Sequence, residues 1–445
     1  MSQSALTPTA NNSLQDWIDW LLGLHATEIE LGLDRVKVVA ERLNLLSPTS
    51  YVITVAGTNG KGSSVAMLSS IYQAAGYKVG SYTSPHILSF NERYQINQQL
   101  VTDQTIVDAF VAIETARQTT KLTYFEFSTL AALYIFSQSS LDITILEVGL
   151  GGRLDAVNIV DADATLITAI DLDHSEWLGT DREVIGFEKS GIMRANQVCV
   201  CSDFNPPKSV AKQAKKLATN YLQAGKDYQL SVLDNNQWQL DSLSDQLTSI
   251  ANLPKPYLKG SFQCQNSAGV VALIQLIEST SPLKVSFDSL VKGLVSVRHP
   301  GRLQELKLAS TKQDWLIDVA HNAQSSSALA SYLKSVNFKA DSVFSVLADK
   351  DYQQMVKEIT PFINNWYIAD LGIARASSLS HLKQILLEAG VDEKRIHCCE
   401  SIDEASKKAQ QSVAKQVLVW GSFFTVSQIF AELVEQGIYI EGISQ

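Results

Sequence analysis

The sequence predicts an α/β protein with two domains. Short apolar runs rich in β-branched residues alternate with segments of helical periodicity, a pattern typical of a parallel sheet covered by helices. At 445 residues the chain is longer than one typical core accommodates. A His-Pro-Gly sequence at 299–301 interrupts the periodicity, and a fresh alternation begins after it. We therefore expect a larger domain at residues 1–297 and a smaller, Rossmann-like α/β domain at residues 298–445.

Two helices are expected ahead of the first strand. Residues 14–25 repeat apolar side chains at helical spacing behind Ser13, a residue type that caps helices, and a second helix is expected at 33–45. Strands are expected at 51–57, 78–84, 143–152 and 164–171, with helical segments between them. Ligands of parallel sheets bind at the carboxyl ends of the strands. The residues that follow each strand are therefore the candidates for a functional site.

Beyond residue 191 the alternation weakens and then resumes. Short runs at 198–203, 228–234 and 237–243 predict a small antiparallel addition, to which we attach no function. In the second domain, strands are expected at 315–322, 342–351, 366–372 and 417–423.

Composition excludes several classes of protein. Apolar residues make up 45% and charged residues 18%, which describes a globular chain with ample material for a core. The net charge of −10, with no basic cluster, argues against a nucleic-acid surface. The five cysteines form no C-x-x-C pair, so we expect reduced thiols and a cytoplasmic location. No apolar run of about 18 residues and no signal-peptide pattern is present, so neither membrane insertion nor export is expected.

The stretch "AGTNGKGSS" at 56–64 has the parts of a phosphate-binding loop in an unusual order. The standard pattern places lysine directly after the second glycine, whereas Lys61 precedes Gly62 here. A strand still leads into the loop and a helix, expected at 65–75, still follows. Backbone N–H groups at the helix start would hold anionic oxygens, and Ser63 or Ser64 could offer a hydroxyl to Mg²⁺. The alternative is a turn that merely joins strand to helix, although its three glycines in six residues cost backbone entropy that a plain turn need not spend.

Polar residues gather after the other strands of the first domain. They are Ser84, His86, Glu147, Asp173, His174 and Lys189. Hydroxyl, carboxylate and imidazole groups are suitable Mg²⁺ ligands, but a loop histidine is more often structural and a single lysine is more often a solvated charge. In the second domain, Arg302 could clamp phosphate or form an interdomain ion pair, and Asp318 could take ribose hydroxyls. Together these residues indicate a nucleotide and metal site.

The ordered set of motifs resembles the Mur ligase superfamily. The motifs that carry the resemblance are, in order, "AGTNGKGS", "SPH", "EVGLGGRLDAVN", "DHSEWLG", "EKSGI", "PGR" and "DVAHN". The match as a whole runs from about Ser13 to "VWGSFFTV" near the C-terminus. Within the superfamily they resemble the folylpolyglutamate synthases, most closely the bifunctional dihydrofolate synthase/folylpolyglutamate synthases of bacteria. The resemblance implies a P-loop-type ATPase domain and a monomeric ligase. Such a ligase would use ATP to join L-glutamate to dihydropteroate and to reduced folates through an acyl phosphate.

The resemblance also implies residue roles. The ATP contacts would be Gly57, Thr58, Asn59, Gly60, Lys61, Gly62, Ser63, Asn266, Arg302, Asp318 and His321. Ser84 and Glu147 would hold one Mg²⁺, and Glu147, His174 and a carbamylated Lys189 a second. Lys61, Glu147, His174 and Lys189 would be the catalytic residues. The pterin contacts would be Glu28, Ile29, Glu30, Leu31, Thr123, Tyr124, Phe125, Glu126, Leu154, Asp155 and Ala156. On pattern alone, aromatic residues such as Tyr124 and Phe125 more often pack in the core than contact a ligand. One departure from the family motif is Ala323, which stands where the family usually has proline.

Three other functions remain open from the sequence. A nucleotide-binding switch would explain the loop but not "PGR" and "DVAHN". A peptidoglycan-precursor ligase would normally carry another substrate domain before the loop, which here starts at Gly57. A folylpolyglutamate synthase without activity on dihydropteroate is the nearest alternative.

Overall fold

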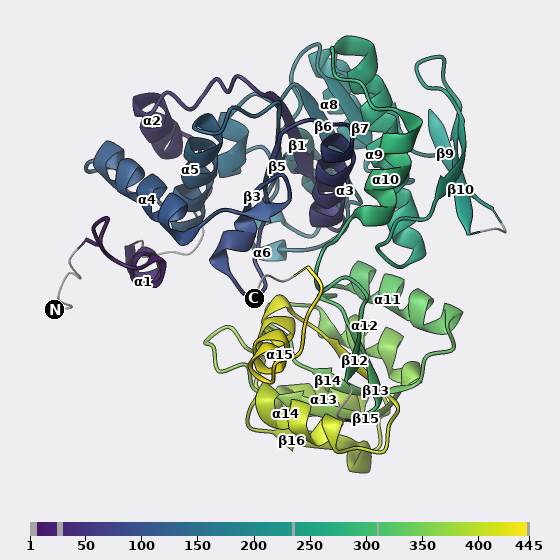
Figure 1. Ribbon diagram of the computed structural model, residues 1–445. Coiled ribbons are helices and arrows are strands. Elements are labelled where there is room, and N and C mark those ends of the chain that lie inside the picture. The colour runs from purple at the N-terminus through teal and green to yellow at the C-terminus, as the bar shows by residue number, and fades with distance from the viewer. Residues whose placement is uncertain (1–6, 25–29, 234–235, 309–310, 443–445) are drawn as a thin grey trace.

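The computed structural model describes residues 7–24, 30–233, 236–308 and 311–442, which form two lobes (Figure 1). The described strands of the first lobe form an eight-stranded sheet in the order β4-β3-β2-β5-β1-β6-β7-β8. Neighbouring strands are parallel except in the pairs β2–β3 and β3–β4, so β3 alone runs against the others. They are β1 (Tyr51–Ala56), β2 (Val79–Tyr82), β3 (Tyr94–Ile96), β4 (Gln99–Leu100), β5 (Ile143–Glu147), β6 (Ala164–Ile167), β7 (Val198–Cys201) and β8 (Asn220–Gln223). The predicted α/β class with a mostly parallel sheet is confirmed.

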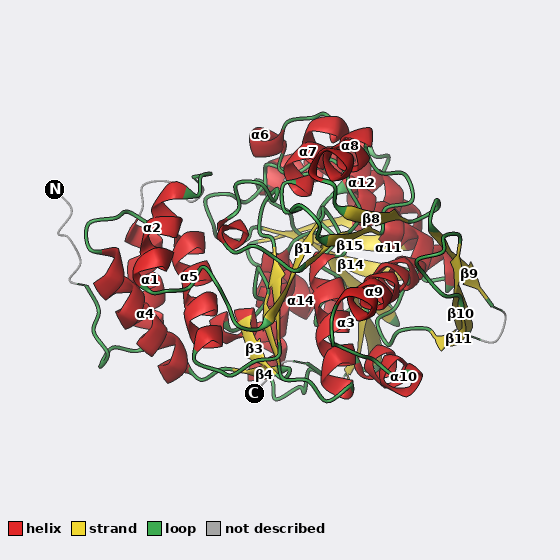
Figure 2. Ribbon diagram, turned by 90° about the horizontal axis from the view of Figure 1, so that it is seen from above, coloured by secondary structure: helices red, strands yellow, loops and turns green. Residues whose placement is uncertain are grey.

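Helices cover both faces of this sheet, so the central strands read as continuous apolar runs. One face packs against α3 (Lys61–Ala74), α9 (Ser261–Thr280) and α10 (Phe287–Ser296). The other packs against α1 (Leu14–Leu24), α2 (Asp34–Arg42), α4 (Asp103–Arg117) and α5 (Tyr124–Ser137), which lie together at one end of the lobe (Figure 2). The remaining helices are α6 (Ser175–Leu178), α7 (Arg182–Ser190) and α8 (Lys208–Leu217).

Contrary to the prediction, the run at 198–203 does not belong to the antiparallel addition but forms β7, which pairs in parallel with β6 and β8 of the main sheet. The antiparallel addition predicted at 228–234 and 237–243 is present. It consists of β9 (Tyr228–Val232), β10 (Gln237–Ser242) and β11 (Ile250–Pro254), at the far edge of the first lobe (Figure 1).

The second lobe has its own sheet, in the order β12-β13-β17-β14-β15-β16 within the described residues. Only β12 is antiparallel to its neighbour. The strands are β12 (Gln304–Leu308), β13 (Gln313–Ile317), β14 (Ala340–Phe344), β15 (Ile363–Ala369), β16 (Ile396–Cys399) and β17 (Gln416–Trp420). Helices α11 (Ala323–Ser335), α12 (Tyr352–Ile359) and α13 (Leu379–Glu388) cover one face, and α14 (Ile402–Gln410) and α15 (Phe423–Glu435) the other. This is the predicted Rossmann-like arrangement.

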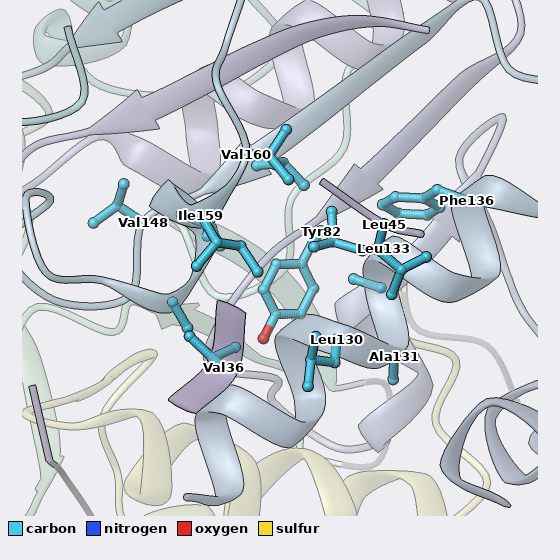
Figure 3. Packing of buried hydrophobic residues seen from close by; sticks show 14 of the residues in the cluster. Val36, Leu45, Tyr82, Leu130, Ala131, Leu133, Phe136, Val148, Ile159 and Val160 are labelled. Carbon is cyan, nitrogen blue, oxygen red and sulfur yellow. The ribbon is translucent and has the colours of Figure 1, made fainter. Parts of the chain in front are cut away.

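One core region fixes the position of α5 against the sheet. Tyr82 of β2 is fully buried among apolar side chains that include Val36, Leu130 and Ile159 (Figure 3). Its hydroxyl donates to Oγ of Ser128 on α5 at 3.0 Å, so the buried polar atom is satisfied. Full burial of such a side chain stabilises the fold by roughly 2–3 kcal/mol. The N-terminus of α5 is therefore held rigidly beside the sheet.

Two helices differ from the boundaries that periodicity suggests. Helix α3 begins at Lys61 rather than near residue 65, because its first turn is Gly-Ser-Ser and carries no apolar pattern. Helix α2 ends at Arg42 rather than near 45, where Asn44 takes a left-handed conformation with φ of 56°. No helix in the described part of the chain is long and apolar enough to cross a membrane.

Candidate active site

The glycine-rich loop lines a cavity of about 310 Å³ to which both lobes contribute residues. Gly57 has φ of 152°, and a Cβ there would stand 1.8 Å from the side-chain oxygen of Thr168. Gly60 has φ of 94°, and its Cβ would stand 2.6 Å from Oδ1 of Asn266. Only glycine fits both positions. Helix α3 begins next, and its first residues also line the cavity, which places free backbone N–H groups where an anion can bind.

Lys61 is folded back onto its own loop. Its Nζ donates to the carbonyl oxygens of Gly57 and Thr58, at 3.1 Å each. Ser63 lines the cavity, and its Oγ accepts a hydrogen bond from Nε2 of Gln263 at 3.1 Å. The hydroxyl of Ser64 is buried and has no partner within the described residues. Of the two serines, Ser63 is the one placed to meet a ligand.

Glu147 ends β5 and is buried beside the second strand-end loop. The Ser84 N–H donates to its Oε2 at 3.2 Å, and both residues line the cavity. Burial raises the pKa of Glu147, an effect that the Lys61 charge and the Ser84 N–H oppose. A nearby cation, such as a metal ion, would stabilise the ionised form of this buried carboxyl group.

Lys189 lies at the end of α7 and is only 3% exposed. Its Nζ donates to the carbonyl oxygen of Gly57 at 2.8 Å. Burial and the charge of Lys61 lower the pKa of Lys189 to about 7. Burial likewise lowers the pKa of His174, to about 4. Near neutral pH, the structure therefore holds a substantially uncharged amine and a neutral imidazole at the cavity wall.

The second lobe places Arg302, Asp318 and His321 on the opposite wall. The Arg302 guanidinium carbon lies 5.1 Å from the centre of the Phe423 ring, and no carboxylate of the described chain lies within 4.0 Å of its nitrogens. Asp318 accepts the N–H groups of Leu303 and Ala320 at 2.8 Å each, and burial raises its pKa. Arg302 is thus a half-buried cation that faces the cavity without a direct carboxylate partner.

Sequence reasoning missed the contacts that join the lobes. Asp173 of the first lobe accepts hydrogen bonds from Lys350 Nζ at 2.6 Å and from Asn322 Nδ2 at 3.0 Å. Burial alone would raise the pKa of Asp173, but the hydrogen bond from His321 and the charges of His321 and Lys350 hold it well below the ordinary value. Asn59 of the glycine-rich loop also bonds to Asn322 and Gln324. The stretch "ADKD" around Lys350 could be recognised as the end of a strand. Asp173, the partner of Lys350, is 177 residues away, so no local pattern could indicate the contact.

The segments predicted to bind the pterin lie outside the residues that line this cavity. Thr123 and Glu126 form a capping box at the start of α5, and Arg35 pairs with Glu126 at 3.0 Å. Asp155 accepts N–H groups of Leu150 and Val157, and Leu154 and Ala156 flank it. Glu30 is exposed, pairs with Arg35 and precedes Leu31. Tyr124 contacts Phe90, and Phe125 contacts Tyr82. Glu28 and Ile29 lie outside the described residues.

The donor set suits magnesium rather than a metal held by protein alone. Within the described residues, no group of three or more His, Cys, Asp or Glu side chains is arranged to hold a metal ion. Mg²⁺ normally takes one or two carboxylates and completes its shell with substrate phosphates and waters. Glu147 and the Ser84 hydroxyl, beside the phosphate loop, fit that requirement. Mg²⁺ takes oxygen ligands, so the Lys189 nitrogen does not suit it, whereas the oxygens of a carbamate formed on that amine would.

Comparison with known proteins places this cavity in a family. Residues 301–423 match the family model described as Mur ligase, glutamate ligase domain. The chain is 38% identical over 425 residues to the dihydrofolate synthase/folylpolyglutamate synthase of Escherichia coli, covering 95% of this chain and 96% of that one. The chain belongs to this family. The family's enzyme from Haemophilus influenzae is also 38% identical, over 95% of this chain and 98% of its own length.

Solved structures of the family share the fold. E. coli FolC in complex with DHPP and ADP has a TM-score of 0.88 and 36% identity, covering 97% of this chain and 100% of that chain. A bifunctional folylpolyglutamate synthase/dihydrofolate synthase with Mn, AMPPNP and L-glutamate bound has a TM-score of 0.86 and 36% identity, over 96% and 100%. As a member of the dihydrofolate synthase/folylpolyglutamate synthase family, this protein is an ATP-dependent ligase of folate metabolism.

Proposed function

We propose that this protein adds L-glutamate to dihydropteroate, forming dihydrofolate, and to reduced folates, forming folylpolyglutamates, through an acyl phosphate. A carboxylate oxygen of the acceptor attacks the γ-phosphorus of ATP, the bond from that phosphorus to the β-phosphate oxygen breaks, and ADP leaves. The glutamate α-amine then attacks the acyl carbon. The bond from that carbon to the phosphate oxygen breaks, phosphate leaves, and the amine loses its proton to solvent.

The observation that carries this proposal is the shared cavity between the lobes. The phosphate loop stands on one wall, and Arg302, Asp318 and His321 stand on the other. ATP held by both walls requires the lobes to close, and closure excludes water that would otherwise hydrolyse an acyl phosphate.

The proposed ATP contacts are those predicted from the sequence. Residues Gly57 to Ser63 hold phosphates through backbone N–H groups, with Lys61 turning from its loop carbonyls to the terminal phosphate. Arg302 offers a bidentate clamp, and Asp318 and His321 take ribose and adjacent groups. Asn266, which donates to Gln263 and lines the cavity, would contact the adenine.

Two Mg²⁺ sites are proposed, and ligand-bound relatives with Mn support the use of a divalent ion. Ser84 and Glu147 would hold the first, and Glu147, His174 and carbamylated Lys189 the second. Bound there, the ions would offset negative charge on phosphoryl oxygens. The lowered pKa of Lys189, about 7, supports carbamylation because only a neutral amine attacks carbon dioxide.

The pterin contacts stay as predicted: residues 28–31, 123–126 and 154–156. Their support is that Tyr124 and Phe125 start a helix locked to the sheet, close to Gly149 of the cavity wall, where a Cβ would stand 2.5 Å from Phe125. We further propose domains at 1–297 and 298–445, and a cytoplasmic monomer that requires neither nucleic acid nor membrane. The free thiols of the five cysteines agree with that location.

The test is glutamate-dependent phosphate release from ATP, with dihydropteroate and a reduced folate as parallel acceptors. Turnover with both is expected. Turnover with the folate alone would leave a folylpolyglutamate synthase that lacks the first activity, and release with neither acceptor would refute the proposal.

A further inference from the structure

Arg93 is a buried cation that no carboxylate neutralises. The residue is 6% exposed, and its Nε donates to Nδ1 of His86 at 2.9 Å. Its guanidinium carbon lies 5.3 Å from the centre of the Phe90 ring and 5.4 Å from that of Tyr124. Among the described residues, no carboxylate oxygen lies within 4.0 Å of its nitrogens. Burying a charge this deeply without a counter-ion is costly.

Other arginines stacked on aromatic rings show what is missing. Arg117, Arg153 and Arg298 each lie over a ring and each also pairs with a glutamate. In the described chain, the stacked arginines without such a partner are Arg93 and Arg302. Arg302 lines the proposed ATP cavity, where a phosphate would supply the missing charge. By the same reasoning, a bound anion would supply the counter-charge that Arg93 lacks in the described chain.

The free part of the side chain is its tip. The two terminal nitrogens make no hydrogen bond in the described structure, yet neither is among its fully enclosed unpaired polar atoms. They therefore keep some accessible surface. His86 fixes Nε and the two rings hold the guanidinium plane, which leaves the terminal nitrogens oriented for a planar, two-oxygen anion such as a carboxylate.

The position of Arg93 lies between the two proposed substrates. One flank is Tyr124, at the start of the predicted pterin segment. On the other, the Thr83 N–H donates to the Arg93 carbonyl at 3.1 Å, and the next residue, Ser84, donates to Glu147 at the ATP cavity. With the pterin and ATP contacts proposed above, an acceptor that reaches from the pterin segment to the ATP phosphates would pass this point with its carboxylate end.

We propose that Arg93 binds the carboxylate of the pterin-bearing acceptor through its two terminal nitrogens and positions it for phosphorylation. The inference rests on the proposed function. Neutralising this carboxylate also lowers its repulsion from the ATP phosphates.

The test compares two ligands with and without the side chain, by titration calorimetry in the presence of ADP. The ligands are dihydropteroate and its neutral carboxamide analogue, which has the same shape. The wild-type protein should bind the acid about 10- to 100-fold more tightly than the amide. Arg93→Gln should lose this preference while binding the amide as the wild type does. Arg93→Lys keeps the positive charge but loses the two terminal guanidinium nitrogens, so it should retain part of the preference for the acid.

Arg117→Gln is the matched control, because Arg117 also stacks on a ring but has Glu114 as its partner. It should leave the preference intact, and ADP affinity should confirm folding of every variant. An equal loss for both ligands in Arg93→Gln would show that Arg93 only supports the aromatic cluster and would overturn the inference. If the wild type turns over yet shows no preference for the acid, the inference fails and the proposed function stands. If it binds and converts neither acceptor, both fail.

Discussion

Replacing Lys350 by methionine tests how the two lobes are held together around the cavity. Lys350 Nζ lies 2.6 Å from Oδ1 of Asp173, and the two side chains are 7% and 8% exposed. Methionine keeps the apolar stem and removes the charge. Loss of one partner from a buried ion pair costs about 3–5 kcal/mol. Asp173 still has Asn322 and His321 as partners, so we expect the lower end, about 3 kcal/mol.

The Asp173–Lys350 pair joins the two lobes. When the lobes separate, Asp173 regains contact with water, so the variant avoids the cost of the unpaired charge without unfolding either lobe. A cost of about 3 kcal/mol shifts the closing equilibrium by roughly 100-fold, and ATP binds to both walls of the closed cavity. The KM for ATP should therefore rise about 10- to 100-fold in Lys350→Met at saturating glutamate and acceptor.

The control is Lys383→Met, which removes a pair of the same 2.6 Å length. That pair, with Glu393, is exposed and lies within one lobe, so the KM should change less than about twofold. A double-mutant cycle with Asp173→Asn should show strong coupling to Lys350. An unchanged KM in Lys350→Met, or simple additivity in the cycle, would refute the closing role of this pair.

Three further outcomes are expected. Lys189→Ala should lose most activity with little change in unfolding temperature, and acetate should partly restore turnover; wild-type turnover would remove the carbamate role. Arg302→Ala should raise the KM for ATP about tenfold or more, since a charged bidentate contact is lost; an unchanged KM would show that its charge does not meet phosphate. Burial raises the pKa of Asp155 from 3.8 to about 6, so its stabilising effect is complete below about pH 4 and is lost as pH rises through 6. Asp155 should contribute at most about 3 kcal/mol to the fall in the free energy of unfolding over this range. Asp155→Asn should make the urea unfolding midpoint less dependent on pH, although Glu147 and Asp318, whose pKa values burial also raises, keep their own contributions. An identical slope in the variant would contradict the assignment.

Local patterns were enough to predict β1, β2, β5 and β6 of the first-lobe sheet. They did not predict β3, β4 and β8, and they placed β7 in the antiparallel addition instead. β1 reads "YVITVA" and is buried on both faces, so its apolar run was unmistakable. Ser84 follows β2 and Glu147 ends β5, and these two strands pair in the same sheet. The start of α3 was predicted late because a phosphate-binding turn selects glycine and serine over apolar periodicity. The spacing of apolar residues reveals which face of a helix is buried. The first turn of α3 has small and polar residues that suit a ligand, so it carries no such spacing.

The contacts that complete the site could not be predicted from spacing. Asp173 and Lys350 are 177 residues apart, and Asn59 and Asn322 are 263 apart, so only the folded chain brings each pair together. Thr123 and Glu126 illustrate a different difficulty, because their T-x-x-E spacing is also that of a capping box, which the structure shows. Substrate contact by these two residues remains a prediction.

The acyl phosphate is the central claim, and oxygen transfer tests it most directly. Dihydropteroate labelled with ¹⁸O in both carboxylate oxygens should be converted with ATP and L-glutamate, and the released phosphate analysed by mass spectrometry. The account predicts one ¹⁸O atom in each phosphate and one retained in the new amide. Phosphate free of ¹⁸O would mean that the carboxylate never bonds to the γ-phosphorus, and would contradict the mechanism.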